Sequence, residues 1–112
     1  MNKFHAKRTF LDGRWFASKM ESQRYLQLKI MEGAGVIRGL ECQPKFDLWA
    51  TNLKTKKPKK IGRYTADFSY IENGEEVYED VKGRMTKDAD LRIKMVEAIY
   101  GIEIRLIRKN DM

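Results

Sequence analysis

The chain has 112 residues, of which 42% are hydrophobic, and a formal net charge of +7. This length predicts one domain with a modest core, and the positive charge favours a polyanionic partner such as nucleic acid, although it also suits solubility and non-specific binding. No stretch approaches the roughly 18 apolar residues of a membrane span, the first residues lack the apolar segment of a signal peptide, and the single Cys42 can form no internal disulfide. We therefore expect a cytoplasmic protein.

The first half of the chain predicts one helix and one long strand beside three smaller features. Ser18 is a good N-cap residue and Gly33 a good helix-ending residue, so a helix is expected between them. Pro44 lies inside an alternating stretch and argues for an edge strand or a bulge. In chain order we expect a basic N-terminal arm at about residues 1–8, a hairpin around residues 12–13, a helix at residues 19–32, a strand at residues 40–48 and a lysine-rich loop at about residues 51–60.

A hairpin at Asn73-Gly74 dominates the second half. Asn-Gly between two alternating stretches favours a two-residue type I′ turn, which would pair Phe68 with Glu79. The expected elements are strands at residues 63–71 and 75–82, a helix at residues 87–100 with an apolar stripe of Leu91, Met95 and Ile99, and a strand at residues 102–106. Together the elements predict a single domain, residues 1–112, of the α/β class with a mixed central sheet flanked by helices.

The same turn would put Asp67 directly across from Asp80. Opposed side chains have Cβ atoms about 4.5–5.5 Å apart, so two carboxylates there repel each other. A divalent cation would convert this repulsion into ligation by hard oxygen donors. Lys82 is two residues beyond Asp80 and should project from the same face, where it could act on a metal-bound phosphate. Alternatively, Asp80 and Lys82 are ordinary solvated residues, because an acid-x-Lys triplet alone is a weak motif.

Four segments, FASKME (16–21), QPKF (43–46), ADF (66–68) and EDVKG (79–83), together resemble a family of small, mostly phage-encoded proteins grouped with the PD-(D/E)xK nucleases. Within that superfamily the chain is similar to phage endonuclease I and the archaeal Holliday junction resolvases. The resemblance covers nearly the whole chain. It implies a restriction-endonuclease-like αβββαβ core, a divalent cation, Mg²⁺ or Mn²⁺, and, if the protein is phage-encoded, the cytoplasm of the host cell.

By this resemblance, Glu21, Asp67 and Asp80 would hold the metal, and Lys82 would complete the catalytic set. The sequence departs from the family pattern in two ways. Ala66 stands where the name-giving proline would be, and the triplet acid is Asp instead of the commoner Glu. The shorter aspartate could alter the metal geometry or weaken binding.

Glu21 has a second interpretation as part of a helix cap. In the stretch from Ser18 to Glu21, the glutamate at the third helical position could bond back to the Ser18 amide as a capping box. Conversely, Glu21 continues an apolar stripe with Tyr25 and Leu28 that should face the sheet. Both roles remain open at this point.

Basic residues outside the cluster are candidates for contacts with the phosphate backbone, which carry no sequence information. These candidates are Lys7, Arg8, Lys54, Lys56, Lys57, Lys59, Lys60, Arg84 and Lys87. We expect a metal-dependent DNA endonuclease that works as a homodimer, and the resemblance alone implies a preference for branched DNA or Holliday junctions. The alternatives are a non-catalytic nucleic-acid-binding module and a nicking or end-processing nuclease on simple DNA.

Overall fold

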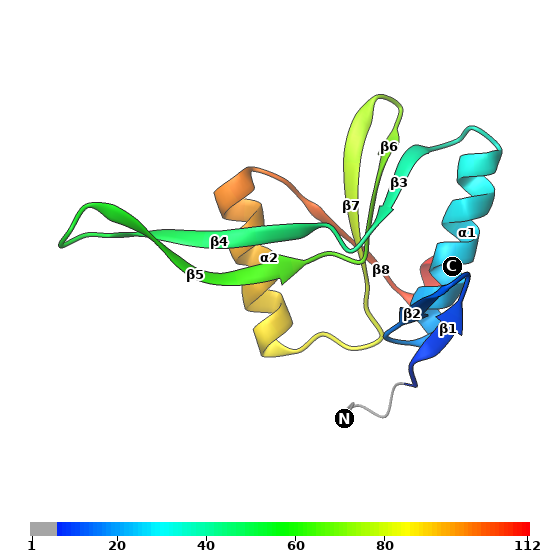
Figure 1. Ribbon diagram of the computed structural model, residues 1–112, viewed down its shortest axis with the longest axis horizontal. Coiled ribbons are helices and arrows are strands. Elements are labelled where there is room, and N and C mark those ends of the chain that lie inside the picture. The colour runs from blue at the N-terminus through cyan, green and yellow to red at the C-terminus, as the bar shows by residue number, and fades with distance from the viewer. Residues whose placement is uncertain (1–6) are drawn as a thin grey trace.

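A four-stranded mixed sheet forms the centre of the protein (Figure 1). The computed structural model describes residues 7–112. In spatial order the strands are β3 (Arg38–Cys42), β6 (Phe68–Glu72), β7 (Glu75–Val81) and β8 (Ile104–Ile107). The strands β3, β6 and β7 are antiparallel neighbours, whereas β7 and β8 run parallel. This arrangement confirms the expected α/β class with a mixed central sheet.

One helix packs on each face of the sheet, so the protein has two apolar cores. Side chains alternate across a strand, and Phe68 and Tyr70 of β6 therefore point to one face, where they pack with Tyr25 and Leu28 of α1 (Lys19–Gly33). The other core contains Ile104 of β8 and the buried residues of α2 (Lys87–Tyr100). None of the helices within residues 7–112 is long and apolar enough to cross a membrane.

A long hairpin, β4 (Lys45–Asn52) and β5 (Lys57–Thr65), leaves the sheet between β3 and β6 and projects from the body of the molecule (Figure 1). The chain bends on both sides of this hairpin. Gln43 adopts a positive φ of 57°, and its amide donates to the Asp67 carbonyl at 2.9 Å. The Ala66 amide donates to the Pro44 carbonyl at 3.0 Å.

The expected continuous strands at residues 40–48 and 63–71 are therefore wrong, because each is divided at this double bend. Pro44 lacks an amide hydrogen, and Gln43 leaves the extended conformation, so neither residue continues the ladder. The prediction of a lysine-rich loop at about residues 51–60 is also wrong, because most of this segment belongs to β4 and β5. The turn is limited to residues 53–56, because the Asn52 side chain accepts the amides of Lys54 and Thr55, and the following lysines belong to β5.

Several local predictions are confirmed. The hairpin around residues 12–13 is formed by β1 (Thr9–Leu11) and β2 (Arg14–Phe16), and the register at Asn73-Gly74 pairs Phe68 with Glu79. The predicted cap Ser18 precedes α1, and α2 has the predicted bounds. The cap of α2, Thr86, was not predicted, and its hydroxyl accepts the Ala89 amide at 3.1 Å. A short 3₁₀ helix, η1 (Lys109–Asp111), follows β8.

The apolar stripe predicted for α2 is wrong at two of its three residues, because only Met95 packs against the second core. Leu91 and Ile99 are exposed, whereas Ile93 and Val96 are buried. The reason is that α2 packs against the β4–β5 hairpin as well as against β8 of the sheet. The buried side of the helix faces both elements, and it is not the side that the predicted stripe occupies.

Candidate active site

Glu21, Asp67, Asp80 and Lys82 come together from separate parts of the chain. Glu21 lies in the first turn of α1, Asp67 lies in the bend before β6, and Asp80 and Lys82 lie at the end of β7 and just beyond it. The charges of Asp80 and Lys82 act on Glu21, and those of Asp80 and Glu21 act on Asp67. The three carboxylates and the lysine therefore form one electrostatic cluster.

Asp67 and Asp80 bridge the last step of the β6–β7 hairpin through their side chains. The ladder ends at Phe68 and Glu79, and the next pair uses carboxylates. The Asp67 amide donates to Oδ1 of Asp80 at 3.1 Å, and the Val81 amide donates to Oδ2 of Asp67 at 2.7 Å. Because of the bend, the Asp67 side chain can turn toward β7, as the turn geometry predicted.

The other carboxylate oxygen of Asp80 contacts a lysine and a tyrosine. Nζ of Lys82 lies 3.3 Å from Oδ2 of Asp80, and the Tyr64 hydroxyl donates to the same oxygen. Asp80 is only 2% exposed, whereas the Lys82 side chain is 20% exposed. The lysine is thus anchored at its acid but still reaches solvent. Tyr64, on β5, is a site residue that sequence reasoning missed.

Burial and the charges of neighbouring carboxylates raise the pKa values of Asp67 and Glu21. Burial first, and then the charges of Asp80 and Glu21, raise the pKa of Asp67 to about 9. Burial also raises the pKa of Glu21, and the Asp80 charge adds to this shift, while a backbone hydrogen bond at Ala17 and the charge of Lys82 oppose it. At neutral pH the cluster therefore retains a proton when no cation is bound.

The donor types of the cluster fit a divalent cation. Carboxylate oxygens are the ligands that Mg²⁺ and Mn²⁺ prefer, and a cation would replace the retained proton. Within residues 7–112, no three carboxylate, histidine or cysteine side chains are already arranged as a metal-binding group. The aspartates instead engage the amides of Asp67 and Val81, and Asp80 also engages Tyr64 and Lys82.

The capping interpretation of Glu21 is half confirmed. The Ser18 hydroxyl accepts the Glu21 amide at 3.1 Å, so Ser18 caps α1. The backbone hydrogen bond of the Glu21 carboxylate is at Ala17, and among the described residues the reciprocal bond to the Ser18 amide is not formed. The carboxylate is buried toward Asp80, as the predicted stripe of Glu21, Tyr25 and Leu28 requires.

A buried ion pair that sequence reasoning missed ties α1 to the sheet near the cluster. Nε and Nη2 of Arg24 donate to the two carboxylate oxygens of Glu79 at 2.9 and 2.6 Å, and the Tyr70 hydroxyl also donates to Glu79. Glu79 is fully buried and directly precedes Asp80. Arg24 is three residues beyond Glu21, so this pair fixes the first turns of α1 against β7.

A surface hollow of about 400 Å³ opens beside Asp80 and Lys82. Arg63 of β5 and Arg92 of α2 contribute to its wall, and Arg92 donates to the Arg63 carbonyl at 2.8 Å. Both arginines were missed from the sequence, because they become neighbours only when the hairpin packs against α2. Arg92 is paired with Asp88, which also lines the hollow, and Arg63 is paired with Asp47. Both guanidinium groups are about half exposed, so they remain accessible to a phosphate group that approaches the cluster.

The predicted phosphate-contact residues occupy three regions. Five lysines are exposed along the β4–β5 hairpin, namely Lys54, Lys56, Lys57, Lys59 and Lys60. Arg84 and Lys87 are exposed around the start of α2. Lys7 and Arg8 are exposed before β1, with the Arg8 guanidinium 4.8 Å from the centre of the Trp15 ring, and the rest of the predicted N-terminal arm, residues 1–6, lies outside the described residues.

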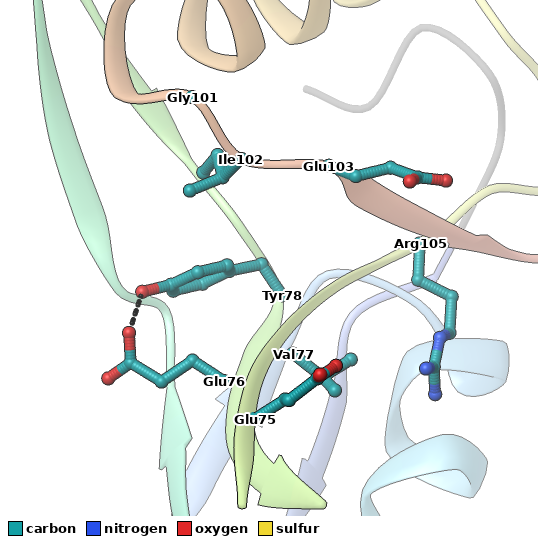
Figure 2. Close-up of a pocket in the computed structure, with 8 residues that line it drawn as sticks. All are labelled: Glu75, Glu76, Val77, Tyr78, Gly101, Ile102, Glu103 and Arg105. Atoms are coloured by element: carbon teal, nitrogen blue, oxygen red, sulfur yellow. Dashed lines mark hydrogen bonds between the residues drawn. The ribbon is translucent and has the colours of Figure 1, made fainter.

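A second hollow, of about 410 Å³, lies at the opposite end of β7 and is acidic. Figure 2 shows Glu75, Glu76 and Glu103 around it, with the Tyr78 hydroxyl bonded to Glu76 at 2.7 Å. Arg105 also contributes to its lining. Three carboxylates around one hollow disfavour a phosphate backbone, so the basic end of β7 is the better candidate for nucleic acid.

The fold and the cluster define a mixed α/β domain with three acids and a lysine gathered at one end of a central strand. The chain belongs to the family described as "Protein of unknown function (DUF1064)", whose model matches residues 1–109. No curated protein matched the sequence.

Proposed function

We propose that this protein is a divalent-metal-dependent DNA endonuclease in which Glu21, Asp67, Asp80 and Lys82 form the active site. The observation that carries the proposal is the meeting of these four side chains, with Asp80 buried and the pKa of Asp67 raised to about 9. A protein interior disfavours such a group of acids unless a bound cation offsets their repulsion. Strongly shifted carboxyls are also characteristic of functional sites.

The order of the elements supports a restriction-endonuclease-like αβββαβ core. If β1, β2 and the β4–β5 hairpin are set apart, the chain runs α1, β3, β6, β7, α2, β8. The acids are then carried by the first helix, by the bend directly before β6 and by β7. This is the arrangement that the resemblance to PD-(D/E)xK nucleases implies.

In this proposal Asp67 and Asp80 hold Mg²⁺ or Mn²⁺ together with Glu21. The cation would polarise the scissile phosphate and lower the pKa of an attacking water. Tyr64 keeps Asp80 oriented through its hydroxyl. The partly exposed ammonium of Lys82 orients the water or offsets negative charge that develops on the phosphate, and Arg63 and Arg92 attract the phosphate to the hollow.

Branched DNA, such as a Holliday junction, is the proposed substrate, and a homodimer is the proposed working form. The substrate preference follows from the resemblance to junction resolvases, and the projecting lysine hairpin supports a partner with a large phosphate surface. A nicking or end-processing nuclease on simple DNA would use the same chemistry.

The decisive experiment is cleavage of labelled four-way junction, flap, duplex and single-stranded DNA with Mg²⁺, with Mn²⁺ and with EDTA. We expect cleavage only with a cation and fastest on the junction, and we expect Asp67→Asn to abolish it. Equal rates on the junction and on simple DNA would support the nicking or end-processing alternative. If the protein binds DNA but cuts no substrate in either metal, the proposal is wrong.

A second candidate is a non-catalytic nucleic-acid-binding module, which the internal bonding of the acids favours. Both oxygens of Asp80 and one of Asp67 already accept hydrogen bonds from protein groups. The exposed lysines would then be the functional feature. Binding without metal-dependent cleavage on the whole substrate panel would identify this candidate.

A further inference from the structure

The outer part of the β4–β5 hairpin is an arm that is exposed along its whole length. Every residue from 49 to 61 is exposed, although the two strands stay paired up to Asn52 and Lys57. At about 3.3 Å per residue, residues 49–53 extend roughly 16 Å, and Figure 1 shows this hairpin reaching away from the sheet. An arm of this length is more than the sheet or α2 needs for its own packing.

The arm carries positive charge on both of its faces. Directly paired residues share a face, so Lys59 opposite Ala50 and Lys57 opposite Asn52 lie on one face, whereas Lys60 opposite Trp49 lies on the other. Residues 48–62 include no acid. Lys60 pairs with Asp47 at the base of the hairpin, while within the described residues no carboxylate pairs with the other four lysines of the arm.

An apolar side chain stands in the turn of this basic arm. Leu53 is 78% exposed and directly follows Asn52, whose side chain accepts the amides of Lys54 and Thr55 at 2.9 and 3.2 Å. The Lys56 amide also donates to the Asn52 carbonyl at 2.7 Å. The turn is therefore held in one conformation, with a leucine presented between lysines.

We propose that this arm enters a groove of the DNA substrate and that Leu53 wedges against the base stack there. The inference rests on the proposed function and adds a DNA-distorting element to it. A minor groove is about 6 Å wide and 7.5 Å deep, too narrow for the paired strands, so the turn of the arm with Leu53 enters it while the strands follow the phosphates at its edge. Apolar side chains inserted there partly unstack base steps and bend the duplex, which lysines on the flanking strands stabilise through the phosphates.

The distribution of charge favours DNA over a second copy of the chain as the occupant. A groove presents phosphates along its length, which suits the lysines that no carboxylate of the described residues pairs with, on one face of the arm and in its turn, namely Lys54, Lys56, Lys57 and Lys59. The acidic hollow around Glu75, Glu76 and Glu103 (Figure 2) could receive the arm of a second copy, but it would contact one side of the arm. That arrangement is the competing outcome of the experiment.

The experiment compares wild type with Leu53→Ala and with the control Leu26→Ala, which truncates a half-exposed leucine on α1. Duplexes and four-way junctions carry 2-aminopurine at successive positions, and binding is measured in Ca²⁺. We expect wild type and the control to raise 2-aminopurine fluorescence at the contacted step. Leu53→Ala should lose this rise and bind about tenfold more weakly, with an unchanged dependence of affinity on salt because no lysine is removed.

Each outcome supports or overturns the inference separately from the nuclease proposal. An unstacking signal that disappears in Leu53→Ala supports the wedge even if no metal promotes cleavage. A Leu53→Ala protein that unstacks bases and binds like wild type overturns the wedge even if wild type cuts junctions. A lower oligomeric state of Leu53→Ala in sedimentation, without any change in base stacking, would show that the arm contacts a second copy of the chain. That result would also overturn the wedge.

Discussion

Asp67 gains its properties from a bend that is not part of any helix or strand. Between β5 and β6 its amide donates both to the Glu79 carbonyl and to Asp80, and its carboxylate accepts the Val81 amide. The side chain is thereby held next to a second buried carboxylate. Since two neighbouring carboxylates are costly to ionise together, the folded protein is less stable when Asp67 and Asp80 are both charged.

Asp67→Asn should make the stability of the metal-free protein less dependent on pH. The pKa of Asp67 is raised from 3.8 to about 9 in the folded state, so the folded state binds more protons than the unfolded state between these values. Stability contributed by the protonated carboxyl is therefore lost as the pH rises from about 4 toward 9, by at most about 1.4 kcal/mol per pH unit. Urea unfolding in EDTA at pH 5 and pH 8 measures this loss.

The matched control for this prediction is Asp88→Asn on α2, whose side chain is 75% exposed. We expect the control to follow wild type. Asp80→Asn is not equivalent to Asp67→Asn, because Asp80 accepts bonds from Tyr64 and Lys82 that prefer a charged carboxylate. If Asp67→Asn loses as much stability between pH 5 and pH 8 as wild type, the carboxyl is not the source of the dependence.

Lys82→Ala should reduce the single-turnover rate of cleavage much more than it weakens DNA binding. The ammonium is anchored at Asp80, and in the proposed mechanism it acts mainly on charge that develops in the transition state. The measurement is single-turnover cleavage in Mg²⁺ at saturating protein, beside a binding titration in Ca²⁺. Lys94→Ala, which changes an exposed lysine on α2 outside the predicted phosphate contacts, is the control. A normal rate for Lys82→Ala would remove the lysine from the mechanism.

At the scale of elements, the position of α1 depends on a buried ion pair. Arg24 and Glu79 connect the second turn of the helix to β7, and the bidentate geometry allows little sliding between the two elements. Glu21 lies about one helical turn before Arg24, and Asp80 directly follows Glu79. The pair therefore sets the separation between the helix acid and the strand acid.

Glu79→Gln should lower the free energy of unfolding by about 3–5 kcal/mol, because it leaves a largely buried guanidinium without its counter-charge. Glu75→Gln, on the same strand but exposed, is the control and should stay within about 0.5 kcal/mol of wild type. Urea denaturation of the three proteins tests the prediction. Similar unfolding free energies for Glu79→Gln and the control would mean that the ion pair contributes no net stability.

The hairpin lysines should govern binding but not chemistry. Replacing Lys54, Lys56, Lys57, Lys59 and Lys60 with Ala should weaken DNA binding and make the slope of log affinity against log salt shallower by roughly 0.9 for each phosphate that the arm no longer neutralises. The single-turnover rate at saturating protein should be unchanged. The control replaces Lys29 and Lys94, two exposed lysines on the helices. An unchanged slope in the five-lysine variant would show that the arm does not touch phosphates.

At the scale of the whole molecule, the described part of one chain carries the cluster of Glu21, Asp67, Asp80 and Lys82 once. Symmetric cutting of two strands requires two such clusters in a closed twofold assembly, so we expect sedimentation equilibrium to give twice the 13.2 kDa mass of the chain. Mixing wild type with Lys82→Ala after subunit exchange should then yield nicked junctions. A protein that stays monomeric while it cuts both strands in one binding event would contradict this prediction.

Local features of the fold could be predicted because they depend on neighbours in the sequence. Asn73-Gly74 determines its turn through the positive φ of both residues, and this turn determines the register that brings Asp67 to Asp80. Ser18 begins α1 by accepting an amide three residues later. The two strands that were predicted as continuous failed at Gln43 and Asp67, where a tertiary bend interrupts an otherwise alternating pattern.

The sequence by itself determined where both helices begin, the central hairpin and the approach of Asp67 to Asp80 and Lys82, because caps, turn type and strand alternation act over a few residues. The place of Glu21 beside them was implied only by the family resemblance. Only the tertiary structure decided that Arg24 pairs with Glu79 across 55 positions and that Tyr64 reaches Asp80 from β5. It also decided that the lysines form a projecting ribbon. Burial, charge coupling and the raised pKa of Asp67 depend on which distant surfaces pack together, and no pattern among neighbouring residues predicts that packing.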